Sequence, residues 1–260
     1  MYKRQLLYYS TTFIGQIYTT FFPPVQRAVV KKEMGTARWY FYRQLRLTFI
    51  FSLPIFIGFI MFGYVFIYLW MLGGDFLEKD VSHAATVMWI LAASKLLLCL
   101  TSPSASLLQA MGHIKFTTKI TAVEAAVNLV LSICFVTLLD WSLAGVAAGT
   151  LAARLCTSTF IMPIVAFHKV GASLSRFARD VGAPVVLAGG LFVALCMGIR
   201  HLFAATSWIL FFSQVGLALL GYVPIAWFIL VPPADRQRIW NLLLSIPAKV
   251  YAKISGLSRL

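Results

Sequence analysis

The chain has 260 residues, of which 60% are hydrophobic and 12% are charged, and its formal net charge is +14. A soluble domain this apolar could not cover its surface with polar groups, so the composition excludes soluble classes of protein. It predicts an all-α, polytopic integral membrane helical bundle. The basic residues fall in short stretches between apolar segments, a pattern typical of membrane topology and not of nucleic-acid binding.

Apolar segments long enough to cross a bilayer follow one another along the chain. About seven transmembrane helices are predicted, at 6–25, 47–72, 84–111, 117–139, 142–167, 183–203 and 207–231. Beyond them, residues 232–260 mix apolar residues with Arg238, Lys249 and Lys253. This composition predicts an amphipathic tail that lies on the cytoplasmic leaflet.

The charges of the loops predict the orientation. Six basic residues stand against one glutamate between the first two spans, and three of the four charges in the next loop are acidic. Because cytoplasmic loops carry an excess of Lys and Arg, the basic loops and the C-terminus are predicted to be cytoplasmic. Lys3 and Arg4 then lie on the wrong side, so we interpret residues 1–5 as foreign to the native protein and the chain as a fragment. The alternative is that Lys3 and Arg4 lie outside the cytoplasm without consequence, since the charge rule is statistical.

Three spans carry one strongly ionisable residue each at membrane depth: Lys95, Glu124 and Arg154. A charge in this position is costly and marks a functional site by default. Helical spacing adds polar neighbours to the same faces. The candidate cavity-lining residues are therefore Lys95, Ser102, Glu124, Asn128, Ser132, Thr150 and Arg154. Gly145 and Gly149 form a small-xxx-small pattern that allows another helix to approach closely.

Two interpretations of these charges stay open. In the first, Glu124 forms a static salt bridge with Lys95 or Arg154 and holds helices together. In the second, the three residues line a cavity, and two cations against one carboxylate leave a positive charge for an anionic head group. The sequence has no Gly-rich phosphate loop, paired carboxylates, zinc spacing or nucleophile elbow. We therefore predict no enzyme activity, no metal and no cofactor.

Three motifs resemble one family of transporters. They are the run 108–115 (LQAMGHIK), the run 124–132 (EAAVNLVLS) and the run 145–150 (GVAAGT), which Pro163 follows. Phe22-Pro23-Pro24 and the basic loop after it add to the pattern. Together they resemble the C-terminal half of lipid-linked oligosaccharide flippases, the polysaccharide and O-antigen exporters of the multidrug/oligosaccharidyl-lipid/polysaccharide superfamily.

The resemblance implies a second bundle of an alternating-access transporter around a cationic cavity. Residues 6–170 would be its five-helix part and 183–231 two additional transmembrane helices, with the N-terminal half of the transporter missing. The implied cargo is a glycan linked to polyprenyl pyrophosphate, used for polysaccharide or lipopolysaccharide synthesis. The implied location is the bacterial inner membrane, in contact with its lipids. Two alternatives remain: a cation-coupled multidrug exporter in which Glu124 binds the coupling ion, and a non-transport subunit of a polysaccharide-assembly complex.

Overall fold

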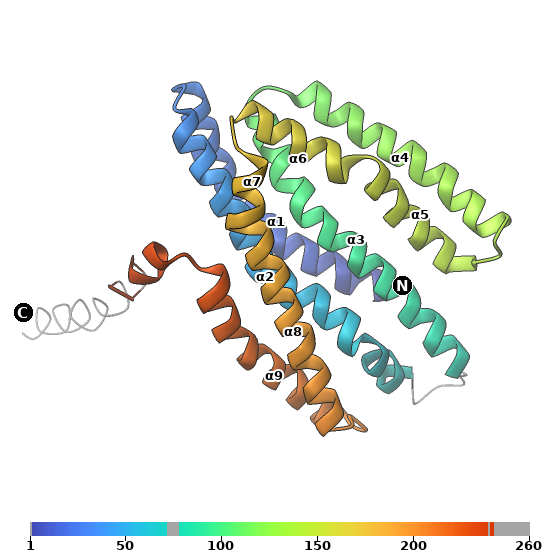
Figure 1. Ribbon diagram of the computed structural model, residues 1–260. Coiled ribbons are helices and arrows are strands. Elements are labelled where there is room, and N and C mark those ends of the chain that lie inside the picture. The colour runs from blue at the N-terminus through green and yellow to red at the C-terminus, as the bar shows by residue number, and fades with distance from the viewer. Residues whose placement is uncertain (1, 72–77, 239, 242–260) are drawn as a thin grey trace, which may run out of the picture.

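The computed structural model describes residues 2–71, 78–238, 240 and 241. These residues form helices and no strand, which confirms the all-α class (Figure 1). The helices are α1 (Tyr2–Val30), α2 (Met34–Met71), α3 (Glu78–Ala110), α4 (Ile114–Thr137), α5 (Ser142–Cys156), α6 (Ser158–Lys169), α7 (Leu174–Phe177), α8 (Ala183–Leu202) and α9 (Trp208–Ile225), with π-helical turns η1 (Ala178–Gly182) and η2 (Ala226–Leu230).

Within the described residues, six helical segments are long and apolar enough to span a membrane. They correspond to six of the seven predicted spans. The exception is α1, which is long enough at 29 residues but carries hydroxyls and an amide such as Ser10, Thr11, Thr12 and Gln16. These side chains lower its hydropathy. The helix packs against both α2 and α3, so part of its polar surface is turned toward protein.

The predicted span 142–167 is interrupted at Thr157, where the backbone leaves the helical region with φ −118° and ψ −88°. The Thr157 hydroxyl donates to the carbonyl of Ala153 at 2.7 Å and closes the end of α5. Downstream, Pro163 has no N–H to continue the hydrogen-bond ladder of α6. The span therefore bends between α5 and α6, as Figure 1 shows.

The helices form three groups, with α1, α2 and α3 in the middle. On one side α5 and α6 pack on α3, and α4 packs mainly on α5; on the other side α8 and α9 pack on α2 (Figure 1). A core cluster that includes Phe62, Phe192 and Tyr222 joins α2 to α8 and α9. Another, with Phe41 and Phe167, joins α2 to α6. The helix α4 is the outlying member, because Thr117 is its one buried residue.

A proline in α2 helps to fix the position of α9. Pro54 has no N–H, so the carbonyl of Ile50, four residues earlier, lacks its usual helical donor. The hydroxyl of Tyr222 in α9 donates to this carbonyl at 2.8 Å. Since an unpaired carbonyl at membrane depth is costly, Tyr222 satisfies a need that the α2 sequence creates.

Successive spans run in opposite directions. The turns at 31–33, 111–113 and 170–173 therefore lie at one end of the bundle, and those at 138–141 and 203–207 at the other (Figure 1). The first three are the turns that the charge pattern predicts to be cytoplasmic. The predicted amphipathic tail falls mostly on residues outside the described part of the chain.

Candidate functional site

Close contact between α4 and α5 creates the candidate site. A Cβ atom at Gly149 would stand 2.4 Å from the Ser132 Oγ and 2.7 Å from its backbone nitrogen, and one at Gly145 would stand 3.1 Å from Phe135 and Val136. Only glycine permits so short a distance between the two backbones. This confirms the close approach predicted from the small-residue pattern, and α4 is the helix that approaches.

The two helices are antiparallel, and polar residues at i, i+4 spacing meet across their contact. Ser132 reaches Val146, and Asn128 meets Thr150. One turn further, Glu124 meets Arg154. The result is a three-rung polar ladder along one seam of the bundle.

Asn128 is the middle rung of this polar ladder. Its Oδ1 accepts from the Ser132 hydroxyl at 3.0 Å and from the Thr150 hydroxyl at 3.3 Å. Thr150 also lies 3.0 Å from the carbonyl of Val146. Amides and hydroxyls within a membrane are tolerated when they satisfy each other in this way. In this rung the Ser132 and Thr150 hydroxyls donate to Asn128, and the oxygen atoms of all three side chains lie close together.

The third rung is a charged pair. Arg154 places Nε and Nη2 each 3.2 Å from Oε1 of Glu124. Its Nη1 donates to both the carbonyl and the hydroxyl of Ser94 in α3, at 3.0 Å each. The Arg154 side chain is 12% exposed and that of Glu124 18%. Arg154 thus ties α5 to α4 and α3 at once.

Lys95 is the second cation of the site. It follows Ser94 on α3, is partly exposed, and lies close enough to Arg154 for the two positive charges to repel. In the part of the chain that the structure describes, its ammonium has no carboxylate or hydrogen-bond partner. Of the two pairings left open by the sequence, the structure has Glu124 with Arg154. The cluster of Lys95, Glu124 and Arg154 therefore keeps one net positive charge.

Ser102 lies away from the polar ladder. It faces α1, where the Tyr18 hydroxyl lies beside the hydroxyls of Ser102 and Thr48. The structure therefore brings together five of the seven predicted residues, places Lys95 next to them, and puts Ser102 in a separate polar contact. Whether any of them contacts a substrate remains a prediction.

Sequence reasoning missed two groups of polar residues. One is Ser94, which anchors Arg154. The other is a line on α2, Gln44, Thr48 and Ser52, with exposures of 1%, 0% and 0%. Their i, i+4, i+8 spacing is the same signal that identified the polar face of α4. It was available in the sequence.

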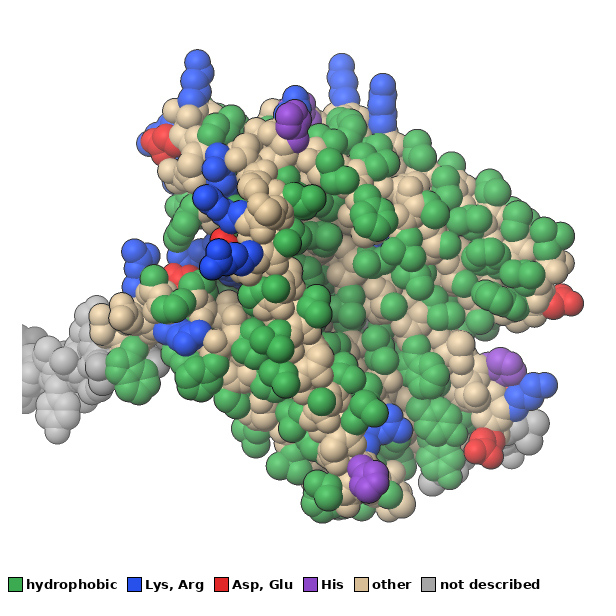
Figure 2. Space-filling view, viewed as in Figure 1, with side chains coloured by type: hydrophobic (Ala, Val, Ile, Leu, Met, Phe, Trp, Pro, Cys, Tyr) green, Lys and Arg blue, Asp and Glu red, His purple; other side chains and the backbone are tan. Residues whose placement is uncertain are grey.

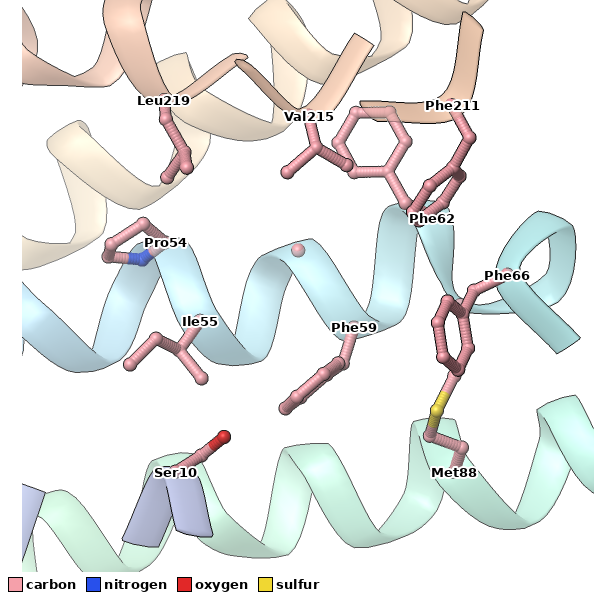
Figure 3. A pocket seen from close by; sticks show the side chains of 12 residues that line it. Ser10, Pro54, Ile55, Phe59, Phe62, Phe66, Met88, Phe211, Val215 and Leu219 are labelled. Carbon is pink, nitrogen blue, oxygen red and sulfur yellow. The ribbon is translucent and has the colours of Figure 1, made fainter. Parts of the chain in front are cut away.

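An apolar cavity of about 320 Å³ opens between α1, α2, α3 and α9. Figure 3 shows the side chains that surround it, with Phe66 and Met88 toward one end, Leu219 and Pro54 toward the other, and Phe59 between them. Ser10 is the one polar side chain among its lining residues. Gly58 also lines the cavity, and a Cβ added there would meet no atom within 4 Å.

The fold and the site define a multi-pass α-helical membrane protein with a charged, hydrogen-bonded seam at membrane depth. No protein-family model and no curated protein sequence matches the chain. A solved structure is similar in fold: the lipid II flippase MurJ in an inward closed conformation, with a TM-score of 0.58 and 18% sequence identity. The match covers 86% of this chain and 46% of the flippase, so the chain spans about half the length of its structural relative.

Proposed function

We propose that this chain is part of a transporter that flips lipid-linked oligosaccharide or polysaccharide precursors across the membrane by alternating access. The observation that carries the proposal is the likeness in fold to about half of a lipid II flippase. The polar ladder and its cations give that fold a site for an anionic cargo. O-antigen and other polysaccharide precursors are the cargo that the sequence motifs favour.

The charge of the cluster supports a polyprenyl-pyrophosphate substrate. Glu124 is engaged by Arg154, which leaves the Lys95 ammonium as the uncompensated charge. An ammonium on a flexible stem is a common ligand for phosphate oxygens. We propose that Lys95 contacts the pyrophosphate, and that Arg154, Asn128 and Thr150 line the same cavity.

The apolar cavity supports a lipid-linked cargo in a different way. Its walls are mainly aromatic and aliphatic side chains of α2, α3 and α9, to which α1 adds Ser10. A polyisoprenoid chain is a hydrocarbon of matching chemistry. We propose that the cavity accommodates part of such a chain while the polar head occupies the charged site.

A cation-coupled drug exporter is the main alternative, and the site gives it less support. A coupling ion would need free carboxylates. Glu124 already binds two nitrogen atoms of Arg154. Within the described residues there is no group of three or more His, Cys, Asp or Glu that could hold a metal ion. A non-transport subunit of a polysaccharide-assembly complex is the second alternative.

The remaining parts of the proposal follow the same assignment. The protein would reside in the bacterial inner membrane with its C-terminus in the cytoplasm, as the basic loops predict. A second half, corresponding to the part of the flippase that this chain does not cover, would complete the cavity. Residues 6–170 would then form the transporter bundle and 183–231 the additional helices.

A reconstituted flipping assay tests the proposal. The complete transporter is placed in vesicles with a polyprenyl-pyrophosphate-linked oligosaccharide, and externally added glycosidase reports how much glycan reaches the outside. We expect Lys95→Gln to lower the flipping rate at least ten-fold without loss of folded protein. Lys115→Gln, an exposed charge at the start of α4, is the matched control. Unchanged flipping by Lys95→Gln would remove Lys95 from the site, and no flipping by the unaltered protein would contradict the function.

A further inference from the structure

One face of α2, near its first turns, holds the segment that connects α6 to α8. Arg38, Tyr42 and Arg46 follow one another at i, i+4 spacing. Arg38 donates through Nε to the carbonyl of Val170 at 3.2 Å, and the Tyr42 hydroxyl to that of Ser173 at 3.4 Å. Arg38 and Tyr42 thereby bind the backbone of this connecting segment.

The third contact depends on a proline. Arg46 donates through Nε and Nη2 to the carbonyl of Asp180, at 3.2 and 3.0 Å. This carbonyl lacks an i+4 donor because residue 184 is a proline. Arg46 donates to this carbonyl instead. Because a carbonyl carries no net charge, this contact fixes the Arg46 side chain without cancelling its positive charge.

The resulting cluster has an excess of positive charge. The Tyr42 hydroxyl lies within reach of the charges of Arg38, Arg46 and Arg176, against the single carboxylate of Asp180. The N–H groups of Arg38 other than Nε, and those on Nη1 of Arg46, have no hydrogen-bond partner within the described part of the chain. Arg176 is exposed and likewise makes no hydrogen bond or ion pair there. Donors are therefore available for an anion.

Two hydroxyl groups lie on the same connecting segment. Ser173 and Ser175 are exposed, and their Oγ atoms lie 2.7 Å apart, immediately before Arg176. Guanidinium groups with adjacent hydroxyls form a donor set that suits the oxygens of a phosphate. The chemistry of the cluster thus indicates a phosphate group as its ligand.

The position of the cluster indicates where that phosphate comes from. Trp39, one residue after Arg38, is 46% exposed at the same end of the bundle, as expected at the head-group layer. Figure 2 shows Lys and Arg side chains gathered over α7 and the start of α8. Further along α8, Val186 and Leu187 are 75% and 55% exposed, and they offer an apolar surface for acyl chains.

We propose that Arg38, Arg46 and Arg176, with the hydroxyls of Ser173 and Ser175, bind the phosphate of an anionic membrane phospholipid whose acyl chains lie along α8. This site is separate from the polar ladder between α4 and α5. It stabilises the connection between the α1–α6 bundle and the α8–α9 pair, because the lipid phosphate would neutralise the α2 arginines that bind the carbonyls of Val170 and Asp180.

Native mass spectrometry of the full natural protein tests this site. Phosphatidylglycerol and phosphatidylcholine are titrated separately, and the dissociation constant of the first bound lipid is measured for each. We expect phosphatidylglycerol to bind at least ten-fold more tightly. Arg176→Gln should weaken phosphatidylglycerol binding about five-fold, the value expected for one cation near an anionic lipid. Arg176 makes no structural bond within the described residues, so this variant is expected to fold.

Two controls separate this site from the general positive charge of the surface. Lys115→Gln removes the same charge from the exposed start of α4 and should leave the dissociation constant unchanged. Excess glycerol phosphate should not displace phosphatidylglycerol. Equal binding of the two lipids, an equal effect of Lys115→Gln, or displacement by glycerol phosphate would each overturn the proposal, the last by identifying a site for soluble phosphate.

Discussion

Arg154 directs two of its nitrogen atoms, Nε and Nη2, to a single oxygen of Glu124, each at 3.2 Å. The remaining nitrogen, Nη1, binds Ser94 of a third helix. One guanidinium therefore joins α3, α4 and α5. A side chain used in this way contributes both to helix packing and to the charge of the cluster, so the two roles must be separated by experiment.

Glu124→Gln is expected to leave the protein folded and inserted but to lower transport at least ten-fold. The substitution leaves Arg154 and Lys95 without a counter-charge. Breaking a fully buried pair costs about 3–5 kcal/mol, and we expect about 1–3 kcal/mol here because both side chains are partly exposed. Thermal unfolding in detergent measures the stability and the flipping assay measures transport. If stability and transport fell in parallel in every variant of Glu124 or Arg154, the salt bridge would have a structural role only.

The double variant Glu124→Gln/Arg154→Gln provides the matched control. It removes both charges, so the stability cost of an unpaired Arg154 disappears. If the pair acts only in packing, transport should recover together with stability. We expect the stability to recover in part and transport to stay low, because Arg154 is itself one of the residues proposed to line the cavity, although Lys95 keeps the cluster at one net positive charge.

Thr150→Val tests the middle rung of the polar ladder. Valine has nearly the shape of threonine but cannot donate to Oδ1 of Asn128, a contact of 3.3 Å in the structure. Hydrogen bonds between membrane helices contribute on average about 0.6 kcal/mol, and we expect a loss of that size. Thr137→Val is the control, since the one bond of the Thr137 hydroxyl to a described residue is to Ile133 in its own helix. A larger loss at Thr137 would contradict a stabilising role for the ladder.

Gly149→Ala should separate α4 from α5. The new methyl group would stand 2.4 Å from Ser132 Oγ and 2.7 Å from its backbone nitrogen, and a backbone atom cannot move away cheaply. We expect a loss of stability of about 1–3 kcal/mol, typical of an overpacked contact. Gly190→Ala, in α8, meets no atom within 4 Å and should be neutral or slightly stabilising. Equal melting temperatures for the two variants would contradict the close approach.

The polar face of α4 could be predicted because its signal is local. Glu124, Asn128 and Ser132 share one helix face by spacing alone, and Gly145 and Gly149 predict a close neighbour by size alone. The six apolar spans likewise follow from composition. The antiparallel register that places Arg154 opposite Glu124 also depends on the length of the turn at 138–141, which makes partners of residues thirty positions apart.

Other features depend on contacts between residues that are far apart in the sequence, and these contacts cannot be predicted from local spacing. Ser94 and Lys95 are neighbours in the chain, yet Ser94 binds Arg154, whereas the Lys95 ammonium has no hydrogen-bond or ion-pair partner in the described residues. Ser102 shares a stripe with Lys95 but lies beside Tyr18 of α1. The break at Thr157 was also missed, because a threonine inside an apolar run is compatible with a continuous helix.

Tyr222→Phe should weaken the attachment of α9 to α2. It removes the donor to the Ile50 carbonyl, which Pro54 deprives of its helical partner. We expect a stability loss of about 1–2 kcal/mol for an unsatisfied buried carbonyl. In a Pro54→Ala background the backbone N–H of residue 54 returns, so the same Tyr222→Phe change should cost less than half as much. Equal costs in both backgrounds would show that the proline does not create the need for Tyr222.

Gly58→Leu should obstruct the apolar cavity without disturbing the fold. A side chain at Gly58 meets no atom within 4 Å at its Cβ, and it extends into a volume of about 320 Å³. Leucine also favours a helix interior by about 1 kcal/mol over glycine, so the melting temperature should not fall. If a polyisoprenoid chain occupies the cavity, flipping of a long-chain substrate should drop several-fold while that of a short-chain analogue changes little.

Gly198→Leu is the matched control, because Gly198 in α8 also meets no atom at its Cβ but lies outside the cavity lining. Equal flipping of both substrates by Gly58→Leu and by the unaltered protein would remove the cavity from the transport path and leave it as a packing defect between α1, α2, α3 and α9.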